Sequence, residues 1–131
     1  MSAPLRPGDL VVVAAGAAVG AALRWGLGLG VADGPGFPWT TFAINVVGCF
    51  ALGLLPLIDG RNHLVTLFAG PGLLGGFTTV STYADQARAL ATAGDLALAG
   101  LYVGGTLAVA MLAAFAGRRL SHRPEPADAL T

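Results

Sequence analysis

The sequence predicts an all-α integral membrane protein, and three observations support this fold class. The chain has 131 residues, of which 55% are hydrophobic and 11% charged, whereas soluble domains carry about a quarter charged residues. Its mean hydropathy is +0.74. Its charges lie at the edges of four apolar runs, each close to the ~20 residues that a membrane-spanning helix needs. We therefore expect one compact bundle of four transmembrane helices.

Residues 1–120 are expected to form this single membrane domain, because the connections between the runs are too short to hold a soluble one. The predicted spans are residues 10–32, 41–58, 64–84 and 96–117. Residues 121–131 have few apolar groups and predict a disordered cytoplasmic tail. A formal net charge of +0 favours membrane lipid over nucleic acid as a partner. The sequence shows neither a nucleophile–base–acid set nor a phosphate loop, so an enzyme is not expected.

Most arginines are predicted to lie on one side of the membrane. With four spans, the N-terminus, the second connection and the C-terminus share a side. The arginines assigned to this side are Arg6, Arg61, Arg118, Arg119 and Arg123. The positive-inside rule places that side in the cytoplasm and predicts a multi-pass protein of the cell membrane with a fixed orientation.

The first run carries Gly16, Gly20 and Arg24 at every fourth position, so all three share one helical face. A Gly-x-x-x-Gly pair is typical of close helix packing in membranes. A guanidinium in an apolar run is costly, and it faces either the membrane interface or the bundle interior. Arg24 either anchors a neighbouring backbone or contacts an anion, and the sequence leaves both interpretations open.

The second run begins at Trp39 and has one conspicuous polar group, Asn45. Thr41, Asn45, Gly48 and Cys49 share one helical face. An amide deep in a span either bonds to another helix or lines a pathway, and both interpretations stay open. Cys49 is interpreted as a packing residue.

The third run contains the stretch around which the bundle is organised, residues 70–85. Glycines and Pro71 weaken the helix in its first half. Hydroxyl groups in the second half offer the freed backbone new partners. We predict a helix broken at mid-membrane, whose carbonyls before the break attract a cation and whose hydroxyls after it attract an anion. The alternative is an ordinary kinked helix with hydroxyls bonded back to its carbonyls.

The fourth run shows two different faces. Gly100 and Gly104 predict a second helix-packing surface. Tyr102 and Thr106 stand one turn apart on the opposite side and form a polar track. A polar track opposite a packing face suggests a lined path.

Three blocks of the chain share a pattern with one known family. They are Gly16–Trp25, Thr41–Phe50 and Gly75–Tyr83, the last containing Gly-Gly-x-Thr-Thr-x-Ser-Thr. Together they resemble the CrcB/Fluc family of fluoride channels, in order and spacing across all four spans. The resemblance implies a subunit of an antiparallel dual-topology dimer that lets fluoride leave the cytoplasm passively, with a structural sodium ion at the dimer centre.

The resemblance also implies roles for individual positions. The backbone carbonyls of Gly75 and Thr78 would hold the sodium ion, and Arg24 would lie in a vestibule. With the hydroxyls after the break, the expected pore residues are Asn45, Thr79, Val80, Ser81, Thr82, Tyr83, Tyr102 and Thr106. Amide, hydroxyl and phenol groups can replace the water around fluoride without trapping it by a full charge.

The chain departs from the family pattern at four positions, one of which is Ala110, where the resemblance implies a third polar residue one turn beyond Thr106. Val80 and Tyr83 stand where the family has pore phenylalanines, and Gln86 stands where many members carry glutamate. With the arginine bias, these changes suggest an alternative, a one-pore or non-conducting partner in a heterodimer with a paralogue of opposite orientation. A small multidrug-type transporter is a further alternative, but it needs a mid-span carboxylate, and the sequence places none there.

Overall fold

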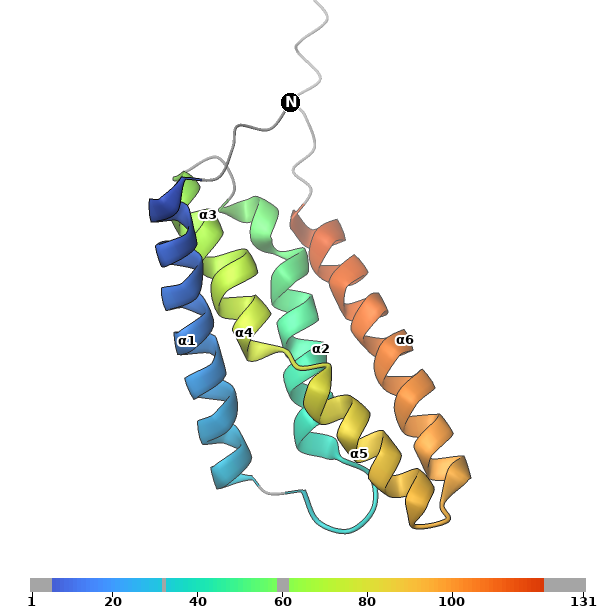
Figure 1. Ribbon diagram of the computed structural model, residues 1–131. Coiled ribbons are helices and arrows are strands. Elements are labelled where there is room, and N and C mark those ends of the chain that lie inside the picture. Colours follow the sequence, from blue (N-terminus) through green and yellow to red (C-terminus); the bar gives the residue numbers. More distant parts are fainter. Residues whose placement is uncertain (1–5, 32, 59–61, 122–131) are drawn as a thin grey trace, which may run out of the picture.

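The computed structural model describes residues 6–31, 33–58 and 62–121, and within them all regular structure is helical (Figure 1). Three helices are long: α1 (Pro7–Gly30), α2 (Trp39–Gly53), which ends in the short turn η1 (Leu55–Leu57), and α6 (Leu96–Ser121). Between them lie α3 (His63–Leu67), η2 (Phe68–Leu74), α4 (Gly75–Phe77) and α5 (Ser81–Thr92).

Four stretches are long and apolar enough to cross a membrane. They are Pro7–Gly30, Trp39–Leu57, His63–Thr92 and Leu96–Ser121. The predicted all-helical, multi-pass membrane protein is thereby confirmed. Between 11% and 28% of the most apolar window of each stretch is buried inside the chain, so most of the apolar surface faces outward.

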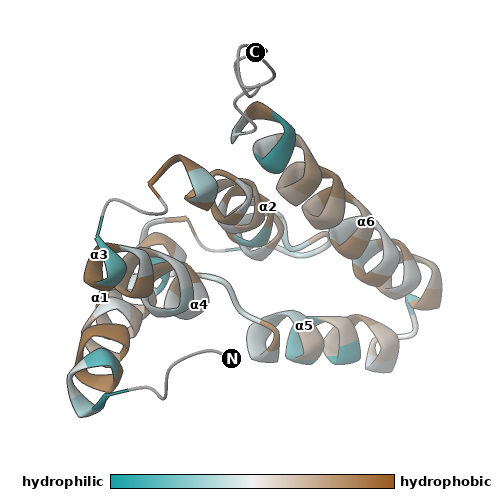
Figure 2. Cartoon of the chain, turned by 90° about the horizontal axis from the view of Figure 1, so that it is seen from above, coloured by the Kyte–Doolittle hydropathy of each residue, from teal (hydrophilic) through white to brown (hydrophobic). Residues whose placement is uncertain are grey.

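The third stretch crosses from one side of the bundle to the other. Its first part, η2 and α4, packs against α1, whereas α5 packs against α6. Helix α2 packs along α6 and lies between the two groups when the molecule is seen from above (Figure 2). Pro71 lies inside η2, whose turns are of the wide π type, because proline has no N–H to continue an α-helix. Pro71 therefore widens the helix without ending it.

The third stretch runs to Thr92, beyond the predicted end at residue 84. The added turns carry Asp85 and Arg88, which form an exposed ion pair of 2.8 Å between Oδ1 and Nη2. A search for apolar runs stops at such charges although the helix continues. The chain leaves the helix at Gly94, whose φ of 89° suits glycine, and Asp95 then accepts a bond from Leu98 N at the start of α6.

Gly16 and Gly20 allow α1 to lie directly against the third stretch, as the Gly-x-x-x-Gly pattern predicts. A Cβ at Gly16 would meet the carbonyl oxygen of Phe68, and one at Gly20 would meet that of Leu73 and lie 2.7 Å from Phe77 N. Gly76 faces the same contact from the other side, against Ala17. This part of the packing prediction is confirmed.

The packing predicted for Gly100 and Gly104 is absent within the described chain. A Cβ at either position would meet nothing within 4 Å. The opposite side of α6 faces inward instead, since Tyr102 and Thr106 are 0% and 3% exposed. Helix α6 therefore packs through the side that carries Tyr102 and Thr106 and leaves Gly100 and Gly104 on the surface.

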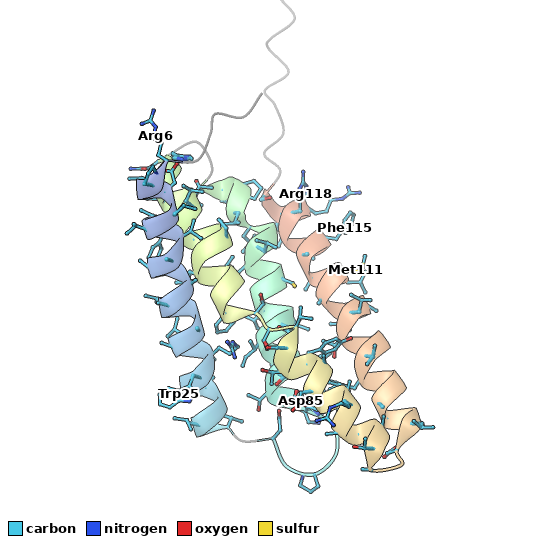
Figure 3. The ribbon with its side chains drawn as sticks, viewed as in Figure 1. Arg6, Trp25, Asp85, Met111, Phe115 and Arg118 are labelled. Carbon is cyan, nitrogen blue, oxygen red and sulfur yellow. The ribbon has the colours of Figure 1, made fainter. Side chains whose placement is uncertain are left out.

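The two ends of the described chain lie at the same end of the bundle. Arg6 and Arg118 both lie there in Figure 3, while Trp25 lies toward the opposite end. This agrees with the shared side predicted for the termini. Arg61, Arg123 and the predicted tail from residue 122 lie outside the described residues.

Candidate functional site

The helical hydrogen bonds of the third stretch are interrupted between Phe77 and Ser81. We call residues 78–80 the paused segment. Thr78 has an extended backbone, with φ −75° and ψ 156°. In a continuous helix the Thr79 N–H would bond the Gly75 carbonyl, but it donates to the Asn45 side chain. The Thr82 N–H would bond the Thr78 carbonyl, but it donates to Thr79 Oγ1. The carbonyls of Gly75 and Thr78 therefore do not receive the N–H groups that a continuous helix would direct at them.

Asn45 clamps this segment from α2. Its Nδ2 donates to the Thr79 carbonyl at 2.9 Å, and its Oδ1 accepts from the Thr79 N–H at 2.8 Å. Asn45 is 9% exposed, so both bonds are buried. A neutral amide has one acceptor oxygen and two N–H donors, which leaves one N–H for another partner. The amide thus bonds across to the third stretch, as one sequence interpretation expected, and one of its N–H groups is left for another partner.

The hydroxyl groups of the segment divide between two tasks. Thr78 Oγ1 donates back to the Leu74 carbonyl at 3.0 Å, as the kinked-helix alternative expects. Thr79 Oγ1 accepts from Thr82 N at 3.1 Å and lies 3.2 Å from both Ser81 Oγ and Thr82 Oγ1. This bond satisfies an N–H in the first turn of α5, where helices leave donors unpaired. The cluster therefore starts α5 and gathers three hydroxyls at one point.

A cavity of about 200 Å³ lies beside the pause. It is lined by Asn45, Cys49, Thr78, Thr79, Val80, Tyr83, Thr106, Leu107 and Ala110. Thr106 lines this cavity, and its Oγ1 is buried without a hydrogen-bond partner among the described residues. A buried hydroxyl without a partner is costly, which marks Thr106 as a candidate site residue.

Tyr83, which lines this cavity, packs against Tyr102. The rings of Tyr83 and Tyr102 are 5.2 Å apart between centroids and inclined at 52°. Tyr83 Oη donates to the Val103 carbonyl at 2.8 Å, and Tyr102 Oη donates to Gln86 Oε1 at 2.8 Å. Val80, in contrast, is 79% exposed, so the rest of the chain covers little of its surface.

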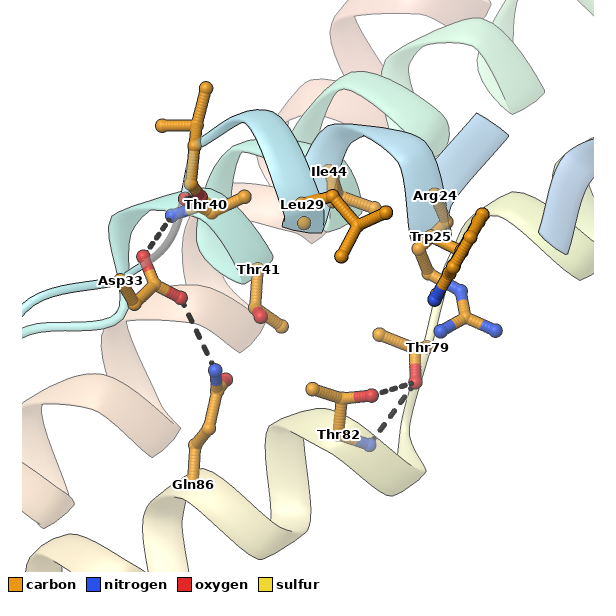
Figure 4. Close-up of a pocket in the computed structure, with 12 residues that line it drawn as sticks. Arg24, Trp25, Leu29, Asp33, Thr40, Thr41, Ile44, Thr79, Thr82 and Gln86 are labelled. Atoms are coloured by element: carbon orange, nitrogen blue, oxygen red, sulfur yellow. Dashed lines mark hydrogen bonds between the residues drawn. The ribbon is translucent and has the colours of Figure 1, made fainter. Parts of the chain in front are cut away.

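Arg24 lines a second cavity of about 450 Å³ (Figure 4). Its Nε donates to the Gly76 carbonyl at 3.3 Å, which is the backbone anchor that one sequence interpretation expected. Asp33, Thr79, Thr82 and Gln86 line the same cavity. Thr79 lines both this cavity and the one at Thr106, so the two share a wall at the paused segment.

Gly75 and Thr78 line a third cavity of about 350 Å³ together with Gly48 and Gly70. A Cβ at Gly75 would have the Gly70 carbonyl oxygen, at 4.0 Å, as its one neighbour, so there is open space beside this glycine. The described residues contain no cluster of three or more His, Cys, Asp or Glu that could hold a metal ion. A cation at this place would therefore rely on backbone oxygens, which suit hard metal ions.

Sequence reasoning did not find the link between Asp33 and Gln86. Gln86 Nε2 donates to Asp33 Oδ2 at 3.2 Å, and Thr40 N donates to Asp33 Oδ1 at 2.7 Å. The N-cap of α2 is Pro38 and Asp33 lies farther upstream, so the capping preference for aspartate gave no local signal for the bond to Thr40. The partner on α5, 53 positions along the chain, left no signal in the sequence pattern.

Comparison with known proteins places these features in a wider group. Residues 11–118 match the family model described as CrcB-like protein, Camphor Resistance (CrcB). A relative from Rubrobacter xylanophilus, named Fluoride-specific ion channel FluC 1, is 43% identical over 88% of this chain and 94% of its own length. One from Nocardia farcinica, named Fluoride-specific ion channel FluC 2, is 42% identical over 87% and 82%. The Fluoride-specific ion channel FluC of Thermus thermophilus is 42% identical over 84% and 91%.

Proposed function

The chain belongs to the CrcB-like family, and from this premise we propose that it is a subunit of a fluoride-selective channel. Fluoride leaves the cytoplasm through it passively, down its own gradient. The single observation that carries the proposal is the buried, unpartnered hydroxyl of Thr106, a residue that lines the same cavity as Asn45. Neutral donors of this kind can replace water around a small anion without trapping it.

The proposed pathway follows the wall that the two cavities share. It passes from the Arg24 vestibule along the hydroxyls at the paused segment to the cavity beside α6. The residues assigned to it are Asn45, Thr79, Val80, Ser81, Thr82, Tyr83, Tyr102 and Thr106. Arg24 carries a positive charge at the entrance, where it raises the local anion concentration.

Fluoride efflux from proteoliposomes tests this function. We expect the purified chain alone to release fluoride and not chloride. Thr106→Val keeps the shape but removes the donor, and it should lower flux by about tenfold, the factor for a hydrogen bond of ~1.4 kcal/mol. Thr92→Val on exposed α5 is the matched control and should leave flux unchanged. Equal loss in both variants would contradict a special role for Thr106.

We propose that the working unit is an antiparallel dual-topology dimer of this chain. The spans bury at most 28% of their most apolar windows within one chain, so a second subunit has ample surface to cover. Gly100 and Gly104 offer small residues for close contact on that surface.

The observation that favours a heterodimer is Val80, because its exposed side chain supplies no aromatic edge to a neighbouring pore. Full fluoride flux from the chain alone would exclude this alternative. Flux that appears only when a paralogue is reconstituted with it would support the heterodimer, with one degraded pore.

We propose a structural sodium ion held by the carbonyls of Gly75 and Thr78. The residues fit such an ion, because Asn45 and Thr79 take the two N–H donors that a continuous helix would direct at these carbonyls. Gly75 and Thr78 also line an open cavity. A sodium ion there would neutralise inward-facing carbonyl dipoles and join the subunits.

Removing sodium should therefore weaken the dimer more than it changes each subunit. We expect full replacement of sodium by N-methylglucamine to lower fluoride flux by at least tenfold and to shift the dimer toward monomer, since a ligand bound only to the assembled state stabilises it. Gel filtration and efflux in matched buffers measure both effects. Unchanged flux and unchanged dimer fraction after prolonged dialysis would contradict the site.

A further inference from the structure

A chain of hydrogen bonds joins α6, α5, the connection between α1 and α2, and α2, and it includes Asp33 and Gln86, which line the Arg24 cavity. Tyr102 Oη on α6 donates to Gln86 Oε1 on α5 at 2.8 Å. Gln86 Nε2 donates to Asp33 Oδ2 in the connection between α1 and α2 at 3.2 Å. Asp33 Oδ1 accepts from Thr40 N in the first turn of α2 at 2.7 Å. Figure 4 shows Asp33 between its two partners.

Asp33 determines the direction in which these bonds run. An ionised carboxylate only accepts hydrogen bonds, so the side of Gln86 that faces it must be the NH₂ group. The amide oxygen then faces Tyr102, and the phenol must act as the donor. The Tyr102 proton is thereby committed to Gln86, and the hydroxyl presents only its oxygen lone pairs to other groups. The Tyr83 proton is likewise committed, to the Val103 carbonyl.

We propose that Asp33 is a positioning residue that limits anion passage by holding the Tyr102 proton on Gln86. This inference rests on the proposed fluoride function and concerns how anion passage is limited at the same site. Fluoride accepts hydrogen bonds and does not donate them, so a phenol that shows only lone pairs does not help to bind it. Tyr102 becomes a donor for the anion only when Gln86 turns its NH₂ group toward the phenol oxygen.

The substitution Asp33→Asn permits this turn without removing the bond to Thr40 N. The Asn Oδ1 can still accept from Thr40 N, and the Asn NH₂ can donate to Gln86 Oε1. Gln86 Nε2 then donates to Tyr102 Oη and releases the phenol proton. The change is isosteric and lies in a connection between helices, so the fold is retained.

A double-mutant cycle in the efflux assay separates this effect from simple loss of charge. Asp33→Asn should raise fluoride flux by about fivefold, the factor for one net hydrogen bond. In a chain that carries Tyr102→Phe, the same substitution should give no gain. Asp85→Asn, which removes an exposed acid on the same half of the molecule, is the matched charge control and should give no gain. An equal gain with Tyr102→Phe, or no gain at all, would overturn the proposal.

A spectroscopic measurement tests the donor direction independently of flux. The chain has two tyrosines, so Tyr83→Phe leaves Tyr102 as the one reporter. Its Raman Fermi doublet differs between a phenol that donates and one that accepts. Asp33→Asn should shift the intensity ratio toward the accepting form, and an unchanged ratio would overturn the proposal. If the ratio shifts but no variant conducts fluoride, the donor direction stands, while the fluoride function and the control of passage both fail.

Discussion

Asn45→Ala is expected to abolish fluoride flux and to destabilise the chain. The substitution removes both bonds to the Thr79 peptide, which are buried and 2.8–2.9 Å long. Each buried backbone group left without a partner costs roughly 1–3 kcal/mol. Here both the N–H and the carbonyl of Thr79 lose their partner. We expect flux to fall by roughly a hundredfold or more, a factor that corresponds to about 3 kcal/mol. Efflux from proteoliposomes and thermal unfolding in detergent measure the two effects.

Asn62→Ala is the matched control for this prediction. Asn62 also accepts a backbone bond, from Leu64 N at 2.9 Å, but it does so at the exposed start of α3. Losing that cap should cost about 1 kcal/mol of stability and leave flux intact. Asn45→Asp adds a second comparison, because it keeps the acceptor for Thr79 N but loses the donor. Full flux in Asn45→Ala would show that the paused segment holds its shape without the clamp.

The number of spans was predictable from sequence, because hydropathy is a local property. A run of about 20 apolar residues has few ways to avoid the bilayer. The ends of the third and fourth helices were not predictable in this way, since α5 continues past Asp85 and α6 runs to Ser121. Ser121 Oγ lies 2.8 Å from the Arg118 carbonyl oxygen and 3.2 Å from that of Gly53, so the last turn of α6 contacts the end of α2. Tertiary contacts of this kind leave no mark on local composition.

The residues of the candidate site were predictable, but most of their pairings were not. Spacing brought Tyr102 and Thr106 to one face of α6, and both are buried there. Spacing gave no means to pair Asn45 with Thr79, which are 34 positions apart, because side-chain hydrogen bonds between helices have no periodicity. The same reason explains why Gln86 was noticed as a departure from the family pattern but not as the partner of Asp33.

The glycines show how packing and site geometry depend on each other. Arg24 reaches the Gly76 carbonyl because α1 lies against the third stretch, and Gly20 permits that approach. If α1 moved outward, the Arg24 guanidinium would lose its anchor and the vestibule wall would open. The small residues of α1 therefore matter to the proposed pathway although none of them touches the cavity at Thr106.

Gly20→Val is expected to prevent the native packing of α1. A Cβ at this position would meet the Leu73 carbonyl oxygen and would lie 2.7 Å from Phe77 N and 3.0 Å from Leu73 C. These are backbone atoms, which cannot move aside as the end of a flexible side chain can. Overpacking costs roughly 1–3 kcal/mol even where neighbours are able to shift, so a larger loss is expected here. Gel filtration after detergent extraction should show little monodisperse protein, and efflux should fall to background.

Gly26→Val separates this steric effect from a general effect of valine in the helix. Gly26 lies on the same helix, and a Cβ there would meet nothing within 4 Å. Both substitutions replace glycine by the same β-branched residue, so helix propensity cancels in the comparison. We expect Gly26→Val to yield folded protein with nearly unchanged flux. If Gly20→Val were tolerated equally well, α1 would have to lie farther from Leu73 than in this structure, and the anchor between Arg24 and Gly76 would lose its basis.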